Sequence, residues 1–480
     1  MKKTGIFQDK INIVFMFACL FGLIIRIYPD GRSLWVDELY SVTTAYGWNS
    51  LYEMFWGEMV YETHPPLYQS ILYYWIRLFG DSDYIVRVPS IIFGVSSVCT
   101  AYLYGGKLFG KKEALLITAL LAVSWGGIYY SHEARNYSLL LLLSVILMLK
   151  SLKLIMSEDM NFRDASELFV IGFLICHTHY FGSLLYFSNL IVLMSFLNVS
   201  RRRIFFLGLF SMTAFAPWLF LNISHMTGKR ASWIAAIPVH HHFMGFFTLF
   251  MASKCAFGTL VMFALYRTAF QSSPFLIATN RRISYSLSVI LLVILFSLLI
   301  TTLYKPIIIT RNLIVLLPYS YLIVSVIFSD TVSNEQSGKG RLFIIPSVCL
   351  SAGLVFVMMI SAFLNFITYE KQDWRGTANS IKLIKNIDKI YCIGGTPKYR
   401  HYLRKSDLEK NSLINVKKDG IKLISKPKEG TVSILWSGYS IYKYNILKKA
   451  VAEKGFDLIK EEYFGSRGIS YNSCAYAVFK

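Results

Sequence analysis

The sequence predicts a polytopic α-helical membrane protein that ends in a soluble α/β domain. Of its 480 residues, 55% are hydrophobic and only 16% are charged, whereas about 25% of residues are charged in soluble globular proteins. Apolar segments long enough to span a bilayer recur up to residue 368, and the composition becomes polar and lysine-rich from about Tyr369. We therefore expect about 11 to 13 transmembrane helices in residues 1–368. Residues 369–480 should form an extracytoplasmic α/β domain.

Apolar runs mark the expected spans. The first covers residues 11–27 and follows Lys2, Lys3 and Lys10, so it resembles a signal peptide. No small-residue cleavage site follows it, and we expect an uncleaved first span with a cytoplasmic N-terminus. Further runs lie at residues 85–109, 114–130, 137–156, 168–180, 183–198, 204–223, 243–266, 283–303, 312–328 and 342–367. Together they give about eleven spans.

The basic residues decide the predicted topology. The short apolar stretch 65–80 opens with Pro65-Pro66 and carries Arg77, so it is either a tight span or a helix lying in the interface. If it does not cross, the basic clusters between spans all fall on the cytoplasmic side, as the positive-inside rule requires. These clusters are Lys107, Lys111 and Lys112; Lys150 and Lys153; Arg201, Arg202 and Arg203; Arg267, Arg281 and Arg282; and Lys339 and Arg341. We therefore expect the first outer loop, residues 28–84, to carry interfacial helices.

The net charge of +21 does not indicate a nucleic-acid-binding protein, because the basic residues form short clusters and no RNA- or DNA-binding motif is present. Topology and membrane lipids with anionic headgroups explain the charge better. The seven cysteines show no metal-type spacing, and the first five lie in apolar runs. Only Cys392 and Cys474 remain as a plausible disulfide pair.

The same topology collects the unusual polar residues on the outer side. Polar groups at membrane depth are costly and tend to mark function, so their collection on one face predicts a single external site. The candidates are Asp37, Glu38, Glu62, His64, Tyr68, Glu133, Arg135, Tyr137, His177, His179, Lys305 and Arg311.

Asp37 and Glu38 are adjacent carboxylates just after the first span. One interpretation is that they are solvated charges, or the first turn of an interfacial helix, where acids are favoured. The functional interpretation is that one carboxylate is a general base that takes a proton from a hydroxyl nucleophile.

Arg135 and Arg311 stand at the outer ends of spans, and Lys305 precedes Arg311. Snorkelling to the interface explains such arginines, and Glu133 is a potential ion-pair partner of Arg135. A guanidinium is also the natural bidentate partner of a phosphate, which predicts recognition of an anionic lipid headgroup. His64 precedes Pro65-Pro66, which predict a helix start, and is expected to face the same vestibule.

The histidine groups are weak metal signals. His177 and His179, and the triplet His240-His241-His242, lack nearby Cys or acidic ligands. The sequence indicates no required cofactor; it permits a divalent metal without pointing to one. In the tail, short apolar runs predict strands near residues 389–393, 432–436, 457–459 and 475–479, with a helix near 444–454. We identify no catalytic motif there.

Several motifs recur in the order seen in a known family. They are Leu34-Trp35-Val36-Asp37-Glu38, His64-Pro65-Pro66-Leu67-Tyr68, Arg87-Val88-Pro89-Ser90, Lys107-Leu108-Phe109-Gly110, Glu133-Ala134-Arg135-Asn136-Tyr137, Arg311-Asn312-Leu313 and Asp373-Trp374-Arg375. With this order and spacing the chain resembles the GT-C membrane glycosyltransferases, most closely glycosyltransferase family 39, the group of protein O-mannosyltransferases and aminoarabinose transferases. The resemblance covers most of the chain and is strongest from Asp37 to Tyr137.

This resemblance implies a GT-C fold and transfer of a sugar from a polyprenyl-phosphate donor to a lipid, glycan or protein acceptor outside the cytoplasm, in a bacterial inner membrane. It matches Asp37 to the family's catalytic acid and Glu38 to its neighbour, while His64 falls where some relatives carry Lys. Single displacement would invert the anomeric carbon. The alternatives are an oligosaccharide ligase or polymerase, and a lipid-linked sugar flippase or transporter. A transporter is disfavoured because no internal repeat is visible.

Overall fold

The computed structural model describes residues 2–62, 64–226, 238–250, 281–304, 306–333, 341–393, 396–404, 408, 413–416, 424–425, 427–437, 441–465 and 473–480. The chain divides into two compact units. Unit 1 contains Met1–Tyr28, Ser50–Ile71 and Arg87–Ile367, and unit 2 contains Pro29–Asn49, Leu72–Val86 and Thr368–Lys480.

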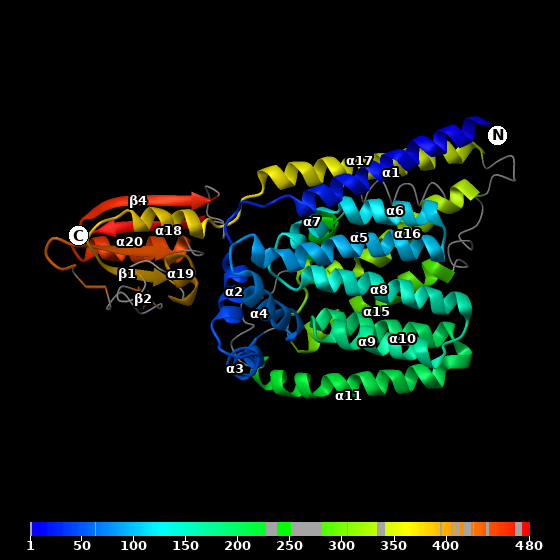
Figure 1. The fold of residues 1–480 in the computed structure, drawn as a ribbon, viewed down its shortest axis with the longest axis horizontal. Coiled ribbons are helices and arrows are strands. Elements are labelled where there is room, and N and C mark those ends of the chain that lie inside the picture. Colours follow the sequence, from blue (N-terminus) through cyan, green and yellow to red (C-terminus); the bar gives the residue numbers. More distant parts are fainter. Residues whose placement is uncertain are drawn as a thin grey trace. The chain divides into compact units, whose positions relative to one another are not determined.

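Unit 1 is built of helices, and its long helices α5, α6, α8 and α10 run nearly parallel to one another (Figure 1). The helices are α1 (Lys2–Ile27), α3 (Leu51–Gly57), η1 (Met59–Tyr61), α5 (Val88–Leu108), α6 (Lys111–Val123), α7 (Trp125–Ser131), α8 (Tyr137–Ser157), α9 (Phe162–Cys176), α10 (Tyr180–Phe196), η3 (Asn198–Ser200), α11 (Arg201–Met226), α12 (Val239–Phe250), α15 (Arg281–Leu303), η5 (Thr310–Leu316), α16 (Leu317–Ser333) and α17 (Arg341–Thr368). Helices α4 (Leu67–Phe79) and η2 (Ile85–Arg87) connect the two units along the chain.

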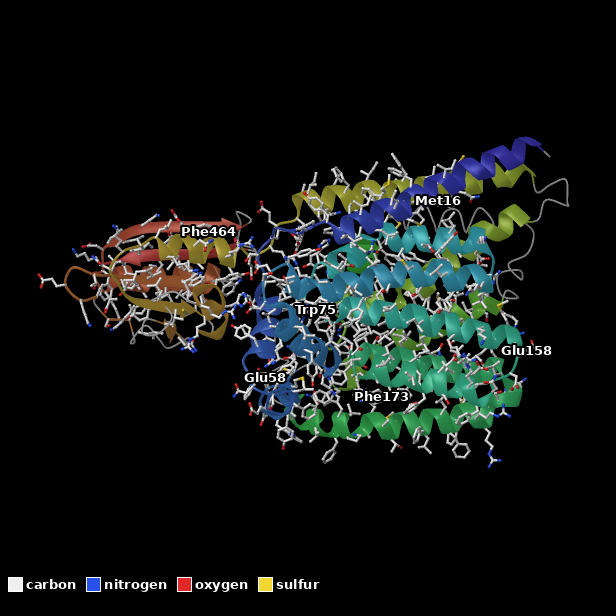
Figure 2. The ribbon with its side chains drawn as sticks, viewed as in Figure 1. Met16, Glu58, Trp75, Glu158, Phe173 and Phe464 are labelled. Carbon is white, nitrogen blue, oxygen red and sulfur yellow. The ribbon has the colours of Figure 1, made fainter. Side chains whose placement is uncertain are left out.

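Length and apolar composition mark the membrane-spanning helices. Within the described residues, six helices are long and apolar enough to cross a membrane, or seven if the bent pair α6 and α7 forms one span. Apolar side chains also cover the outside of the bundle: Met16 on α1 is 60% exposed and Phe173 on α9 is 42% exposed (Figure 2). The predicted multi-pass helical architecture is confirmed. Much of the predicted run 243–266 lies outside the described residues.

The predicted span over residues 114–130 is broken in the structure. Helix α6 ends at Val123, α7 begins at Trp125, and their axes differ by 60°. The Ser124 hydroxyl accepts a hydrogen bond from the backbone N–H of Gly127 and so caps the new helix. The Arg26 guanidinium donates to the carbonyl oxygens of Leu121, at 2.8 Å, and Ala122. The last carbonyls of a helix have no intrahelical hydrogen-bond partners. Arg26 supplies these partners, and so lowers the free-energy cost of a helix break in a buried position.

The stretch 65–80, predicted as an interfacial helix, forms α4. The helix begins directly after Pro65-Pro66, as expected for residues that suit a helix start. Its Arg77 guanidinium donates to the carbonyl oxygens of Ala45, at 3.0 Å, and Trp48, so this cation completes a backbone turn instead of pairing with an acid.

Unit 2 contains a five-stranded sheet in the order β2-β1-β3-β5-β4. Strands β1 (Ile387–Ile393), β2 (Leu413–Val416) and β3 (Val432–Ser437) are parallel, and β4 (Leu458–Gly465) and β5 (Ser473–Phe479) join as antiparallel strands. Helices α18 (Trp374–Lys382), α19 (Thr396–Leu403) and α20 (Ile441–Glu453) complete the predicted α/β fold, and α2 (Val36–Tyr46) also belongs to this unit. Strand β2 was not predicted.

Alternating residues on the central strands supply two cores. Tyr391 and Leu435 pack in one buried cluster with Tyr444 of α20. Trp436 instead contacts Tyr399 and Trp374, with ring centroids 4.6 and 6.0 Å away. Side chains of successive strand residues point to opposite faces, so the sheet is covered on both sides.

The suggested disulfide between Cys392 and Cys474 is wrong: both are buried cysteines that form no disulfide. Cys392 lies on β1 opposite Trp436 of β3, and β5, which carries Cys474, pairs on the other side of β3. Two strand spacings are about 10 Å, beyond the about 7 Å Cα separation that a disulfide can bridge.

Candidate active site

Three connecting segments of unit 1 are tied together by hydrogen bonds near the start of α8. The backbone N–H of Leu67 donates to the carbonyl of His177 at 3.0 Å. The Asn136 side chain donates to the carbonyl of Thr178 at 2.7 Å. These bonds join the start of α4, the turn before α8 and the turn between α9 and α10.

A second set of contacts fixes the turn that carries Arg135. The Tyr68 hydroxyl lies 2.8 Å from the Ser90 hydroxyl, and Ser90 donates to the carbonyl of Arg135 at 3.1 Å. Arg135 itself is buried, at 7% exposure. Tyr68, predicted as a pocket residue, therefore acts on the backbone of this turn through Ser90.

The connected segments bring a histidine pair together. The ring centroids of His64 and His179 are 4.9 Å apart, and the ring of Tyr137 lies 6.4 and 5.8 Å from them. His179 and Tyr137 are almost completely buried. Three residues that the sequence places in separate loops thus form one cluster.

Two arginines surround this cluster. The guanidinium carbon of Arg311, carried by η5, lies 5.7 Å from the ring centroid of Tyr137. Burial, together with the charges of Arg135 and Arg311, lowers the pKa of His64 well below its usual range and that of His179 to about 3. Both imidazoles are therefore neutral at physiological pH, and the cluster's positive charge belongs to the arginines.

The hydrogen bonding of His179 assigns its tautomer. Its Nδ1 accepts a hydrogen bond from the backbone N–H of Phe181 at 3.0 Å, so the proton of the neutral ring is on Nε2. That Nε2 is buried and has no hydrogen-bond partner among the described residues. A buried N–H donor is costly unless an acceptor, such as a ligand oxygen, satisfies it.

Two acidic candidates lie on the same connecting segments. Glu133 is fully buried, and its carbonyl accepts from the backbone N–H of Arg135 at 2.7 Å. The carbonyl of Glu62 accepts from the side chain of Asn222 at 2.8 Å, and Asn222 accepts from the hydroxyl of Tyr180 at 2.6 Å. Glu62 is thus linked by its backbone to the residue that follows His179.

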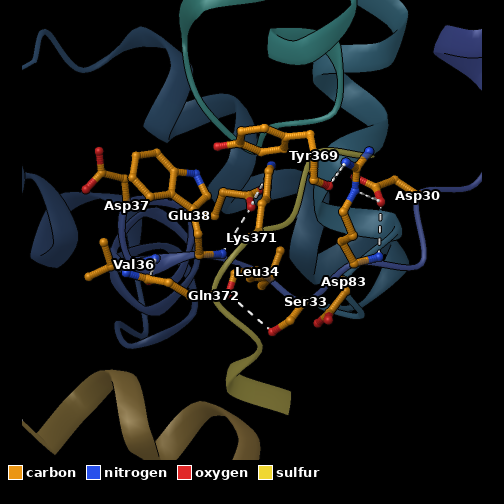
Figure 3. A network of polar contacts seen from close by, with 12 residues as sticks. Asp30, Ser33, Leu34, Val36, Asp37, Glu38, Asp83, Tyr369, Lys371 and Gln372 are labelled. Carbon is orange, nitrogen blue, oxygen red and sulfur yellow. Dashed lines mark hydrogen bonds and ion pairs between the residues drawn. The ribbon is translucent and has the colours of Figure 1, made fainter. Parts of the chain in front are cut away.

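The acidic pair lies in unit 2, where Asp37 and Glu38 form part of the first turn of α2. Glu38 is fully buried; its Oε2 accepts from the backbone N–H of Trp35 at 3.2 Å and lies 3.4 Å from the ammonium of Lys371. Asp37 is partly exposed, and its carboxylate points away from the Glu38–Lys371 pair (Figure 3). The two neighbours therefore occupy different environments.

Comparisons with known proteins bear on this arrangement. A family model described as dolichyl-phosphate-mannose-protein mannosyltransferase matches residues 63–221. A search of curated proteins finds no match. The fold is similar to two crystal structures of ArnT from Cupriavidus metallidurans. The structure bound to undecaprenyl phosphate gives a TM-score of 0.57 at 13% identity, covering 97% of each chain. The apo structure gives a TM-score of 0.59 at 12% identity, covering 99% of this chain and 98% of that one. The oligosaccharyltransferase of Archaeoglobus fulgidus, solved with Zn and sulfate, gives a TM-score of 0.52 at 12% identity, covering 95% of this chain and 73% of that one.

The chain has the GT-C fold. The resemblance to GT-C membrane glycosyltransferases stated from the sequence motifs is therefore confirmed. The matched region 63–221 includes His64, Arg135 and His179, so the family model covers most of the cluster.

In unit 1, the structure brings together five of the predicted site residues: His64, Arg135, Tyr137, His179 and Arg311. Asp37 and Glu38 belong to the other unit, and Lys305 lies outside the described residues. Among the described residues, no group of three His, Cys, Asp or Glu side chains is placed to hold a metal ion.

Sequence reasoning missed Lys371, the partner of Glu38, and Gln372, the partner of the Val36 backbone. They lie 333 or more residues away in the chain, beside the motif Asp373-Trp374-Arg375. That motif was the only local signal that this segment has a special role.

Proposed function

We propose that this protein is a glycosyltransferase that moves a sugar from a polyprenyl-phosphate-linked donor to a hydroxyl acceptor on the extracytoplasmic side. The acceptor is a lipid, a glycan or a protein. The observation that carries the proposal is the arrangement of Arg135 and Arg311 around the neutral pair His64 and His179.

This arrangement suits a phosphate. Guanidinium groups bind phosphate oxygens bidentately and stay charged in a buried setting. Neutral imidazoles add hydrogen-bond donors without adding positive charge that would repel the arginines. Two comparisons support a lipid-phosphate donor: one ArnT structure is bound to undecaprenyl phosphate, and the description of the matching family model names dolichyl-phosphate mannose.

The chemistry is a single displacement. The acceptor oxygen forms a bond to the anomeric carbon while the bond from that carbon to the phosphate oxygen breaks. The acceptor proton passes to Asp37, and the polyprenyl phosphate leaves with its negative charge stabilised by the arginines. Attack opposite the leaving group inverts the anomeric carbon.

We assign the base to Asp37 instead of Glu38. Glu38 is fully buried, accepts from the backbone of Trp35 and pairs with Lys371. Asp37 is the member of the pair with solvent access. Phosphate is already a good leaving group, so we expect the displacement to need no cofactor; activity measured with and without EDTA decides whether a metal contributes.

The test uses the full-length protein in nanodiscs with a panel of undecaprenyl-phosphate monosaccharides and cell-envelope extract as acceptor. We expect release of undecaprenyl phosphate and an acceptor-linked sugar of inverted configuration. Use of only diphosphate-linked oligosaccharides would instead identify a ligase or polymerase. Movement of intact lipid-linked sugar across proteoliposomes, without bond cleavage, would identify a flippase.

A further inference from the structure

The N-terminal turn of α2, which carries Asp37, is held by the segment that enters the C-terminal sheet. The first N–H groups of a helix have no intrahelical acceptor. Here the N–H of Trp35 donates to Glu38, and the N–H of Val36 donates to Oε1 of Gln372 at 3.2 Å. The backbone just before Asp37 is therefore tied to the side chains of Glu38 and Gln372.

Gln372 is fixed by Trp374. The indole N–H of Trp374 donates to the same Oε1 of Gln372 at 2.9 Å, and both residues are buried. Trp374 in turn packs against Tyr399 and Trp436 of the sheet's aromatic core. A continuous chain of contacts thus runs from the sheet to the backbone of α2 (Figure 3 shows its end at Val36 and Gln372).

Lys371 makes the second contact with this turn. Its ammonium pairs with Glu38, and both side chains are almost inaccessible, at 2% and 0% exposure. A buried ion pair has one preferred geometry, because separating it leaves a charge without compensation. The pair therefore defines the rotation of the α2 turn and with it the direction of the Asp37 side chain.

The segment just before α2 also forms hydrogen bonds with the C-terminal part of the chain. The hydroxyl of Tyr402 accepts from the N–H of Leu34 at 2.9 Å and donates to Asp83 at 3.0 Å. The guanidinium of Arg375 also pairs with Asp83, at 3.1 Å. The chain is therefore held at Leu34, before Asp37, as well as at Glu38, after it.

We propose that Lys371, Gln372 and Trp374 are positioning residues that set the orientation of Asp37, so that the C-terminal domain takes part in the catalytic step. This inference rests on the proposed role of Asp37 as general base. It assigns a function to a domain in which the sequence shows no catalytic motif.

The central test is a pair of variants at one position. Gln372→Met keeps the side-chain length but removes the acceptor, whereas Gln372→Glu keeps it. Misplacing a reacting group by about 1 Å can cost about 10²-fold in rate, so we expect kcat of Gln372→Met to fall about 10- to 100-fold. The Kd for undecaprenyl phosphate should be unchanged, and Gln372→Glu should restore most of kcat. Trp374→Phe, which removes the second donor to Gln372 together with part of a buried ring, should also lower kcat.

A control variant distinguishes loss of Asp37 positioning from a general loss of domain stability. Tyr391→Phe alters the opposite face of the sheet, where the Tyr391 hydroxyl accepts from the N–H of Ser425 at 3.1 Å. Its kcat per folded molecule should match wild type even if its melting temperature falls. Wild-type kcat in folded Gln372→Met and Trp374→Phe overturns the positioning role alone, provided that Asp37→Asn is inactive. Full activity of Asp37→Asn overturns the proposed base and the positioning role together.

Discussion

The imidazole rings of His64 and His179 lie 4.9 Å apart, and both are within electrostatic reach of Arg135 and Arg311. Two arginine cations and two neutral imidazoles, each from a different segment of the chain, thus lie close together.

Arg311→Ala should weaken binding of undecaprenyl phosphate. Loss of a charge-assisted hydrogen bond costs about 1.5 to 3 kcal/mol, which is roughly tenfold or more in Kd. Arg135→Ala should behave alike. Microscale thermophoresis with the lipid in nanodiscs measures the effect, and Arg202→Ala, an exposed arginine on α11, is the control. Unchanged affinity in both site variants would remove phosphate recognition from these residues.

His179 should contribute a neutral donor through Nε2. His179→Phe keeps the ring but removes the N–H, and a hydrogen bond is worth about 1 kcal/mol, so Kd should rise about fivefold. His179→Gln places an amide N–H in a similar position and should bind more tightly than the Phe variant. Equal affinity of the Phe, Gln and wild-type proteins would show that Nε2 does not contact the lipid.

Acid should destabilise the protein through the same histidines. Their folded-state pKa is lowered, to about 3 for His179, whereas an unfolded histidine has a pKa of about 6.5. Below about pH 6.5 the unfolded state takes up protons that the folded state excludes, so the free energy of unfolding falls as the pH drops from about 7 toward 3. Thermal unfolding at several pH values should show a shallower decline for His179→Phe than for wild type; identical slopes would contradict the assignment.

Asp37→Asn should abolish most turnover, because the amide keeps the size of the carboxylate but cannot accept the acceptor's proton. General base catalysis contributes about 10²-fold or more. Binding of undecaprenyl phosphate should survive. Glu38→Gln is the matched comparison, and if it is dead while Asp37→Asn is active, the base is Glu38. If both are folded and active, the acidic pair has no role in proton transfer.

The orientation of the chain in the membrane is open to direct labelling. In a background without native cysteines, Lys111→Cys and Arg202→Cys should react only with reagents that reach the cytoplasm. Lys382→Cys in the tail and Tyr52→Cys in the first loop should react from outside; all four positions are exposed or on exposed helix ends. Cytoplasmic labelling of Lys382→Cys would overturn the charge-based topology.

Periodicity and turn chemistry predicted the elements that depend on local sequence. The start of α4 after Pro65-Pro66 and the strands β1, β3 and β5 arise from short-range patterns. Strand β2 has only four residues among polar neighbours, and its pairing with β1 supplies the stabilisation that local sequence does not. The helix break at Ser124 could not be seen from hydropathy, because hydropathy is averaged over a window of residues. A single serine whose hydroxyl caps the next helix hardly changes that average.

For the candidate site, the sequence singled out individual residues but not the contacts between distant segments. The cluster residues were identified by their polarity at the ends of spans, which is a property of each residue alone. The contacts of Glu38 with Lys371 and of Val36 with Gln372 join residues more than 330 positions apart. No pattern within one sequence relates such residues, because the contact depends on how the whole unit folds.

The bond of Arg26 to the last carbonyls of α6 has a consequence for the evolution of homologous chains. The buried guanidinium of Arg26 and the helix break at Ser124 depend on each other. The cation needs the carbonyls of Leu121 and Ala122 as acceptors, and these carbonyls need a donor because the helix ends there. The two positions should therefore co-vary. Homologues with an apolar residue in place of Arg26 should carry a residue at position 124 that continues the helix, and the loss of one feature without the other should be rare among descendants.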